Sequence, residues 1–146
     1  MARFFTIGKL FLVVLTILFW FSSVTDGLGW YNTKTEVVIQ NDISPNTTLT
    51  FHCKSGDEDL GEHSLASKDS WKFRFFINFF DTTLYWCNFW WVDENGKQRQ
   101  EGFQIFKTKR DHPRCGYYCR YDVRSDSIYG FSGGEEADLV YKWPVS

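Results

Sequence analysis

The sequence lacks an excess of charge of either sign. Its 16 Lys and Arg residues nearly balance its 18 Asp and Glu residues, the formal net charge is −2, and the two signs are interspersed along the chain. A nucleic-acid-binding domain needs a basic patch or stripe, which this sequence does not contain. We therefore expect no nucleic-acid partner, and the charge balance selects no other charged partner.

The sequence also offers little support for catalysis and lacks the motif of a zinc module. The spacing of its three histidines, His52, His63 and His112, does not indicate acid–base catalysis, and the chain contains no C-x2-C pair. The acidic run Asp57-Glu58-Asp59 is contiguous, whereas a calcium loop spaces its oxygen ligands around a sharp turn. We expect no cofactor, no metal and no enzymatic activity. A hydrolase that uses His52 as its acid–base group is the least favoured alternative.

A helical period of 3.6 residues is missing as well, and an alternation of apolar and polar residues takes its place. Trp71, Phe73 and Phe75, for example, alternate with Lys72 and Arg74. Such alternation is typical of strands with one buried face, and frequent turns between short strands are typical of a sandwich or barrel. We expect an all-β fold, a small β-sandwich of about eight antiparallel strands. The expected strands span residues 36–40, 49–54, 71–77, 83–92, 103–108, 115–124, 128–131 and 138–143.

Aromatic residues, by contrast, are abundant, at 20% of the chain. Residues 83–92 (TLYWCNFWWV) are apolar on both faces, which predicts a central strand covered on both sides, with Trp86, Phe89, Trp90 and Trp91 in the core. A sugar-binding protein stacks its ligand on exposed aromatic rings instead. The aromatic residues that we expect to be exposed are Trp30, Tyr31, Tyr129 and Trp143.

The longest uncharged apolar run lies near the start of the chain, at residues 10–21. Arg3 and Lys9 precede it, and small and polar residues follow it, in the order of a secretory signal peptide. The run is shorter than the roughly 20 residues that span a bilayer, which disfavours the alternative of a membrane anchor. We expect cleavage after Gly27 or Gly29 and a secreted, extracellular protein with no stable membrane insertion. The predicted segments are a signal peptide at residues 1–27 and a single domain at residues 30–146.

The four cysteines of the chain are Cys53, Cys87, Cys115 and Cys119. An even number in a small exported domain predicts two disulfides, with a zinc site as the less favoured alternative. Two cysteines four residues apart on an extended strand lie roughly 13 Å apart, and a disulfide needs Cα atoms within about 7 Å. We therefore expect Cys53 and Cys87 to pair with Cys115 and Cys119. Sequence alone does not decide the order of these pairs, and we favour Cys53–Cys119 with Cys87–Cys115. A Cys115–Cys119 bond remains open if the chain folds back at Gly116.

One N-glycosylation sequon is present, Asn46-Thr47-Thr48. Pro45 precedes it, so we expect it on an accessible turn. In a secreted protein this predicts a glycan on Asn46.

Ordered motifs make the chain resemble the plant self-incompatibility S-protein homologues. Residues 52–61 (HCKSGDEDLG) are similar to the H-C-K-S-x-D-D-D-L-G motif of that family. The W-x-F-x-F pattern from Trp71 and the TTLYWC run at residues 82–87 follow in the family's order, and the match extends from about Val37 to about Phe131. The resemblance implies a small secreted β-sandwich with two disulfides and no enzymatic activity. It also implies a signalling ligand, because founding members are recognised by a pollen receptor in the rejection of self pollen.

Recognition by such a scaffold is expected in its exposed loops, because loops on a rigid framework carry binding residues. We predict that a cell-surface receptor contacts loops at residues 57–62, 93–100 and 109–114, and that the protein is a monomer. The candidate contact residues are Asp57, Glu58, Asp59, Lys109, Arg110 and Asp111. A secreted carbohydrate-binding module is the main alternative to a receptor ligand.

Overall fold

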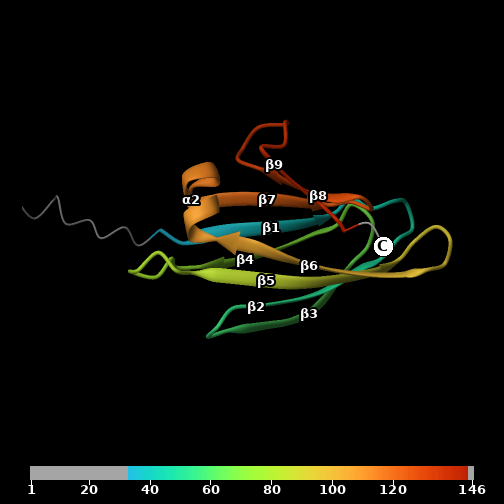
Figure 1. Cartoon of the computed structure of the whole chain (residues 1–146), viewed down its shortest axis with the longest axis horizontal. Helices are drawn as coiled ribbons and strands as arrows, with labels where there is room; N and C mark the ends of the chain where they lie inside the picture. Colours follow the sequence, from blue (N-terminus) through green and yellow to red (C-terminus); the bar gives the residue numbers. More distant parts are fainter. Residues whose placement is uncertain (1–32, 145–146) are drawn as a thin grey trace, which may run out of the picture. The chain divides into compact units, whose positions relative to one another are not determined.

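The computed structural model describes residues 33–144, which form nine strands and one helix (Figure 1). The predicted signal peptide, Trp30 and Tyr31 lie outside these residues. The elements are β1 (Thr35–Asn41), β2 (Leu49–Lys54), β3 (Asp59–Leu65), β4 (Ser70–Phe75), β5 (Leu84–Val92), β6 (Gln98–Lys107), α2 (Thr108–Cys115), β7 (Tyr118–Val123), β8 (Ser127–Phe131) and β9 (Leu139–Lys142).

The strands form two sheets, which confirms the predicted β-sandwich. One sheet has five strands in the order β4-β1-β7-β8-β9, and the other has four in the order β3-β2-β5-β6. Their neighbours are antiparallel except for β1 and β7, which run parallel from Glu36 opposite Tyr118 to Asn41 opposite Val123. The expectation of a purely antiparallel sandwich is therefore wrong at this pair. Parallel neighbours need a long connection, and here it contains the whole four-stranded sheet.

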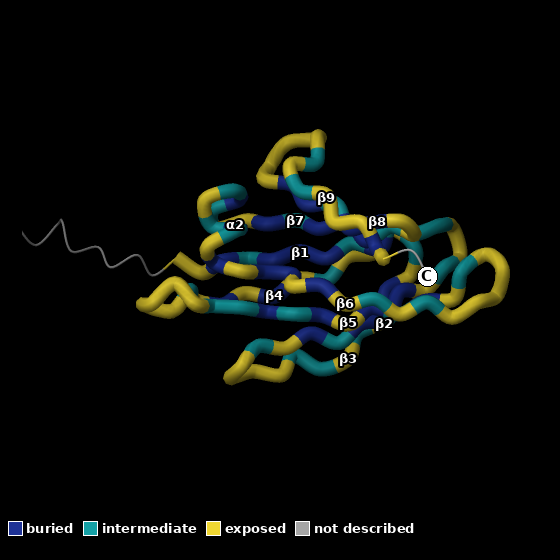
Figure 2. The backbone as a smooth tube through the Cα atoms, in the orientation of Figure 1, coloured by how far each residue is buried: buried dark blue, intermediate teal, exposed yellow. Residues whose placement is uncertain are grey.

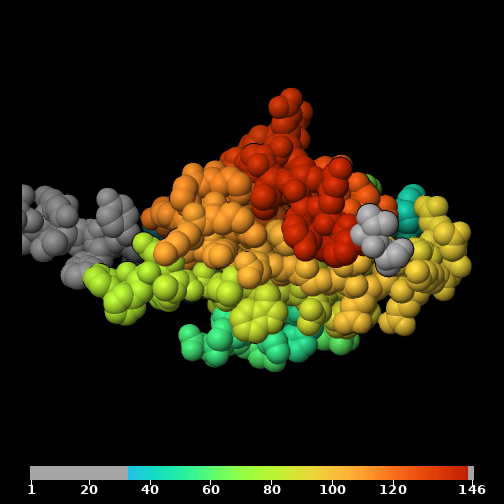
Figure 3. Space-filling model, viewed as in Figure 1, coloured from blue at the N-terminus to red at the C-terminus, as the bar shows by residue number. Residues whose placement is uncertain are grey.

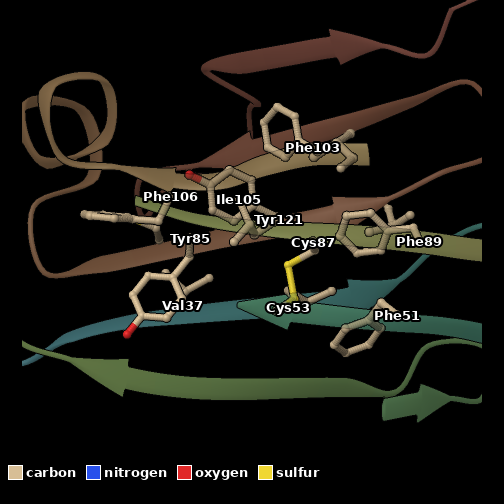
Figure 4. Close-up of a cluster of buried hydrophobic side chains, with 14 of the residues drawn as sticks. Val37, Phe51, Cys53, Tyr85, Cys87, Phe89, Phe103, Ile105, Phe106 and Tyr121 are labelled. Atoms are coloured by element: carbon tan, nitrogen blue, oxygen red, sulfur yellow. A yellow bond between two sulfur atoms is a disulfide. The ribbon is translucent and has the colours of Figure 1, made fainter. Parts of the chain in front are cut away.

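The core lies between the two sheets and is built by alternate residues of each strand. Buried residues form stripes along the strands in Figure 2, and Figure 4 shows aromatic rings from facing strands meeting around one disulfide. Each large side chain buried in this way contributes roughly 1.5–3 kcal/mol to folding. The residues of this core include Val37, Phe51, Tyr85, Phe89, Phe103, Ile105, Phe106 and Tyr121.

Strand β5 corrects the prediction that it is covered on both faces. Tyr85, Cys87, Phe89 and Trp91 are buried as expected, but the alternate side chains, Trp86 and Trp90 among them, are half-exposed or exposed. The reason is that the four-stranded sheet packs against its partner sheet with one face only. The tryptophans at positions 86 and 90 therefore lie on the outer face of the sheet.

The disulfides differ from the favoured pairs. Cys53 and Cys87 lie opposite each other on β2 and β5 and form one bond across the strands, with Cα atoms 4.0 Å apart. Cys115 and Cys119 form the other, with Cα atoms 5.2 Å apart. The prediction against this second pair assumed an extended chain. Instead α2 ends at Cys115 and Gly116 turns the chain with a φ of 58°, which is the reversal at Gly116 that had been left open.

Three predicted loops are wholly or partly regular structure. Residues 108–115 form helix α2, which buries Thr108, Asp111 and Cys115 at a spacing of three and then four residues, the period of one helical face. The predicted acidic loop is shorter than expected, because β3 begins at Asp59 and pairs with β2. Strand β6 likewise begins at Gln98, within the loop predicted at residues 93–100.

Candidate functional site

The predicted recognition segments do not all lie together. The β5–β6 turn lies at one end of the sandwich, whereas α2 and the β4–β5 loop lie at the other (Figure 1). The space-filling view shows the β5–β6 turn and the β4–β5 loop projecting from opposite ends of the molecule (Figure 3). The β2–β3 turn and the β4–β5 loop line the same hollow. We call residues 55–58 and 76–86, which line that hollow or lie between its lining residues, the recognition end.

The β2–β3 turn presents the predicted contact residues Asp57 and Glu58, both exposed. Its shape is fixed by Ser55, whose hydroxyl accepts hydrogen bonds from the backbone N–H groups of Asp57 (3.3 Å) and Glu58 (3.0 Å). Tyr85 donates its hydroxyl proton to Glu58 Oε2 at 2.8 Å. Burial, together with this bond, raises the pKa of Tyr85 to about 12, so Tyr85 remains a donor at neutral pH. Glu58 is thereby held in place at the mouth of the hollow.

Asp59, the third predicted acidic contact, is engaged within the sheet. Its Oδ1 atom lies 2.5 Å from His52 Nε2 and accepts the N–H of Gly61 at 2.9 Å. The hydrogen bond with His52 is the main reason that the pKa of Asp59 is lowered. His52, the candidate acid–base group of a hydrolase, therefore ties β2 to β3.

The β4–β5 loop carries the two most exposed phenylalanines of the described residues, and the sequence analysis missed both. Phe79 is 92% exposed and Phe80 is 78% exposed, and their rings pack edge to face at 5.5 Å. A detectable signal was present, because two adjacent aromatic residues lie inside a run of turn-forming residues, with Asn before them and Asp-Thr-Thr after them.

The loop is held rigidly by the side chain of Asn78. Its Nδ2 atom donates to Thr82 Oγ1 (2.7 Å), and its Oδ1 atom accepts the N–H of Thr82 (2.8 Å). The N–H of Asn78 also donates to Thr83 Oγ1 at 2.8 Å. Asp81 has a φ of 54°, which an Asp tolerates better than most residues. The two phenylalanines are therefore presented on a closed, hydrogen-bonded loop.

Between the turn and the loop lies a hollow of about 400 Å³. It combines carboxylates from one side with aromatic and hydroxyl groups from the other, which suits a protein side chain better than a metal or a reacting group. Its lining residues are Ser55, Gly56, Asp57, Glu58, Phe76, Asn78, Thr82, Thr83, Leu84, Tyr85 and Trp86.

Helix α2 corrects one predicted contact residue. Lys109 is exposed and Arg110 is half-buried, but Asp111 is fully buried and cannot reach a receptor. Asp111 accepts hydrogen bonds from Arg110 (2.7 and 3.0 Å), from Arg114 (3.2 and 3.3 Å) and from the N–H of Lys107 (2.7 Å). It holds the helix on the sheet.

Arg114 extends this network beyond the helix. It donates to Asp138 at 2.5 Å and to the hydroxyl of Tyr121 at 2.8 Å, which joins α2 to β7 and to the segment before β9. Burial is the main cause that raises the pKa of Tyr121. These residues stabilise the scaffold. Of the contact residues predicted in α2, only Lys109 and part of Arg110 remain available to a partner.

Other predicted surface features have mixed outcomes. Asn46 is exposed, in a turn with a φ of 67°, and its glycosylation stays a prediction. Trp143, expected to be exposed, is 5% exposed and donates its indole N–H to the carbonyl of Arg124, whereas Tyr129 is half-exposed. Within residues 33–144, no cluster of His, Cys, Asp and Glu has a geometry that suits a metal ion. Helix α2, the one helix in the same range, is not long and apolar enough to cross a membrane.

Comparison with known proteins points to one plant family. The family model described as plant self-incompatibility protein S1 matches residues 36–143. S-protein homolog 29 of Arabidopsis thaliana is 36% identical over 138 residues, which covers 93% of this chain and 96% of that protein. S-protein homolog 24 of the same plant is 38% identical over 110 residues, which covers 75% of this chain and 69% of that protein.

A solved structure agrees with the fold. It is described as a structure of self-incompatibility protein homologues, a widespread family of small, highly stable, secreted proteins from plants. It superimposes with a TM-score of 0.57 and 25% sequence identity, and the match covers 77% of this chain and 96% of that one.

Proposed function

We propose that this chain, which belongs to the plant self-incompatibility protein S1 family, is a secreted ligand that a cell-surface receptor protein binds at the recognition end. Its role is cell–cell recognition, of which the rejection of self pollen is one form. We assign it no catalytic role.

The observation that carries this proposal is the pair of exposed phenylalanines on a rigid loop. Burying a phenylalanine side chain gains roughly 1.5–3 kcal/mol, so two rings left in water form a strong potential anchor. Aromatic residues are enriched among the side chains that dominate protein–protein binding energy. Because Asn78 already fixes the loop, a partner loses little free energy in ordering it.

The charges around the anchor indicate the chemistry of the partner. Asp57 and Glu58 border the hollow, and the exposed Asp81 follows the phenylalanines in the same loop. A complementary receptor surface has an apolar socket for Phe79 and Phe80 with cationic residues beside it. Such acidic groups at a rim mainly accelerate association and weaken in their effect as salt is raised.

The test is a binding titration of labelled protein on pollen tubes and on leaf cells. We expect saturable binding to at least one cell type, and we expect a Phe79→Ser/Phe80→Ser double variant to bind at least about tenfold more weakly. Val140→Ser, which removes an exposed apolar side chain on β9, is the matched control and should bind normally. Circular dichroism checks that both variants fold.

Two results would overturn the proposal. One is an absence of saturable binding to both pollen tubes and leaf cells. The other is a double variant that binds as tightly as the Val140→Ser control.

A further inference from the structure

The outer face of the four-stranded sheet carries a second surface, which meets the recognition end at Trp86, a lining residue of both hollows. Trp86, Asn88 and Trp90 point outward from β5, with the two indoles half-exposed. The strand register places Thr50 beside Trp90 and His52 beside Asn88. In the space-filling view the atoms of β5 and β6 lie in front and those of β1 are hidden (Figure 3).

A hollow of about 400 Å³ lies on this face beside Trp86. Its lining residues include Asn88, Gly102, Gln104 and Tyr141. Gly102 lies opposite Asn88 in the register, and a Cβ atom there would meet Asn88 Oδ1 at 3.4 Å. The absence of a side chain at Gly102 keeps this hollow open between an indole and two amides.

The hollow is close to electrically neutral. Its one charged lining residue is Arg110, whose guanidinium donates to the buried Asp111 at 2.7 and 3.0 Å and to the carbonyl of Gln104 at 2.5 Å. The same guanidinium lies 4.9 Å from the centre of the Phe103 ring. Its charge is thus paired within the protein, and the hollow offers an anion little attraction.

An aromatic ring, two amide side chains and a neutral lining together favour one class of ligand. A wholly apolar ligand would cover the amides of Asn88 and Gln104 without satisfying their hydrogen bonds, which costs about 1–3 kcal/mol per buried group. A neutral saccharide can cover the indole ring and also satisfy the hydrogen bonds of the amides. Its C–H faces pack on aromatic rings, while its hydroxyl groups bond to amides. The neutral lining and the neutral ligand are complementary in charge.

We propose that this face, centred on Trp86, is a binding site for a neutral oligosaccharide. Trp86 forms the stacking platform, and Asn88 and Gln104 bond the hydroxyl groups. Trp90 lies four residues further along β5, roughly 13 Å at the rise of an extended strand, and provides a second platform. The ligand is therefore a chain of several sugar rings that lies along β5. Lys54, whose ammonium lies 5.7 Å from the centre of the Trp86 ring, is exposed and is not a lining residue of the hollow.

The test is a titration with defined soluble sugars, read by tryptophan fluorescence and by calorimetry. The probes are cellohexaose, xylohexaose and mannohexaose, with an oligogalacturonate of similar length as the anionic comparison. We expect at least one neutral probe to bind and the anionic one to bind more weakly. Trp86→Ala should weaken binding by about tenfold or more.

A second variant tests the site without changing Trp86, a residue whose removal could also disturb the sheet. Gly102→Gln fills the hollow but leaves every aromatic ring in place, and it should also weaken binding by about tenfold. The Phe79→Ser/Phe80→Ser variant should bind sugar normally, which separates this site from the recognition end. Binding to none of the neutral probes at millimolar concentration, or equal binding by wild type and Gly102→Gln, would overturn the proposal.

Discussion

Asp122 on β7 lies in an environment that disfavours the ionised form of its carboxyl group. It is 5% exposed, and within residues 33–144 its Oδ1 atom has no hydrogen-bond partner, although Arg120 Nε lies 3.3 Å away. Arg124 approaches the other oxygen only to 3.9 Å. Burial is the main cause that raises the pKa of Asp122, because the two arginines do not fully compensate the lost hydration.

This raised pKa predicts a stabilising substitution. A carboxyl group with a higher pKa in the folded state opposes folding when it is ionised, so Asp122→Asn should raise the free energy of unfolding at about pH 7. The gain should shrink as the pH falls through the raised pKa, because Asp122 is then neutral as well. Urea unfolding at several pH values measures both effects. A variant that is less stable than wild type at neutral pH would contradict this account.

Glu36 is a control, because its pKa is shifted in the opposite direction to that of Asp122. The hydrogen bond from Arg74 (2.5 Å) is the main cause that lowers the pKa of Glu36. A lowered pKa means that the ionised carboxylate stabilises the fold above its unfolded pKa and loses that effect as the pH falls. Glu36→Gln should therefore be less stable than wild type at neutral pH and approach it in acid.

At the scale of single residues, the sequence predicted which side chains of a strand share a face but not whether a face is covered. In β4 the alternation placed Trp71, Phe73 and Phe75 on one face correctly. In β5 successive residues are apolar, so alternation did not distinguish its two faces. Trp86 and Trp90 were taken as core because they are apolar. Tryptophan is amphipathic and also occurs on half-exposed surfaces, so composition does not distinguish a second core face from a binding face.

Among the elements, α2 shows that a run of charged residues can contain a buried side chain that holds the element on the sheet. Residues 109–114 look like a solvated loop, yet Asp111 is fully buried because Arg110 and Arg114 surround its carboxylate. A buried charge is tolerated only when it is paired in this way. The spacing of Thr108, Asp111 and Cys115 suggests a helical face, but a single eight-residue segment is too short for that pattern to exceed chance.

The two disulfides should differ in what they contribute. In the chain-entropy model the Cys53–Cys87 bond, with a separation of 34 residues, contributes about 4 kcal/mol, and the Cys115–Cys119 bond, with a separation of 4, about 2 kcal/mol. Cys53→Ala/Cys87→Ala should therefore lower the free energy of unfolding more than Cys115→Ala/Cys119→Ala. Guanidinium unfolding measures the difference, and peptide mapping without reduction should recover the same two pairs. Peptides that link Cys53 to Cys119 would instead support the pairing favoured from sequence.

For the whole molecule, the arrangement of loops depends on pairings between distant segments. Strand β1 pairs with β7 about 80 residues later in the chain, and this parallel pair closes the five-stranded sheet. Which turns share one end of the sandwich follows from that topology, which period-2 alternation does not encode. The sequence therefore predicted the sandwich, and its recognition segments stay a prediction. It did not predict that the β2–β3 turn and the β4–β5 loop border one hollow.

Export of the whole chain should remove its first residues. β1 begins at Thr35, in the interior of the five-stranded sheet between β4 and β7, so cleavage after Gly27 or Gly29 leaves every strand intact. Mass spectrometry of the protein secreted by plant cells should find an N-terminus at Leu28 or Trp30. Replacing three leucines of the apolar run (Leu10, Leu12 and Leu15) by Gln should keep the protein inside the cell with Met1 present, whereas Val140→Ser should be exported normally. A protein that reaches the cell surface, stays bound to the membrane and retains residues 1–27 would contradict the signal peptide and favour an anchor.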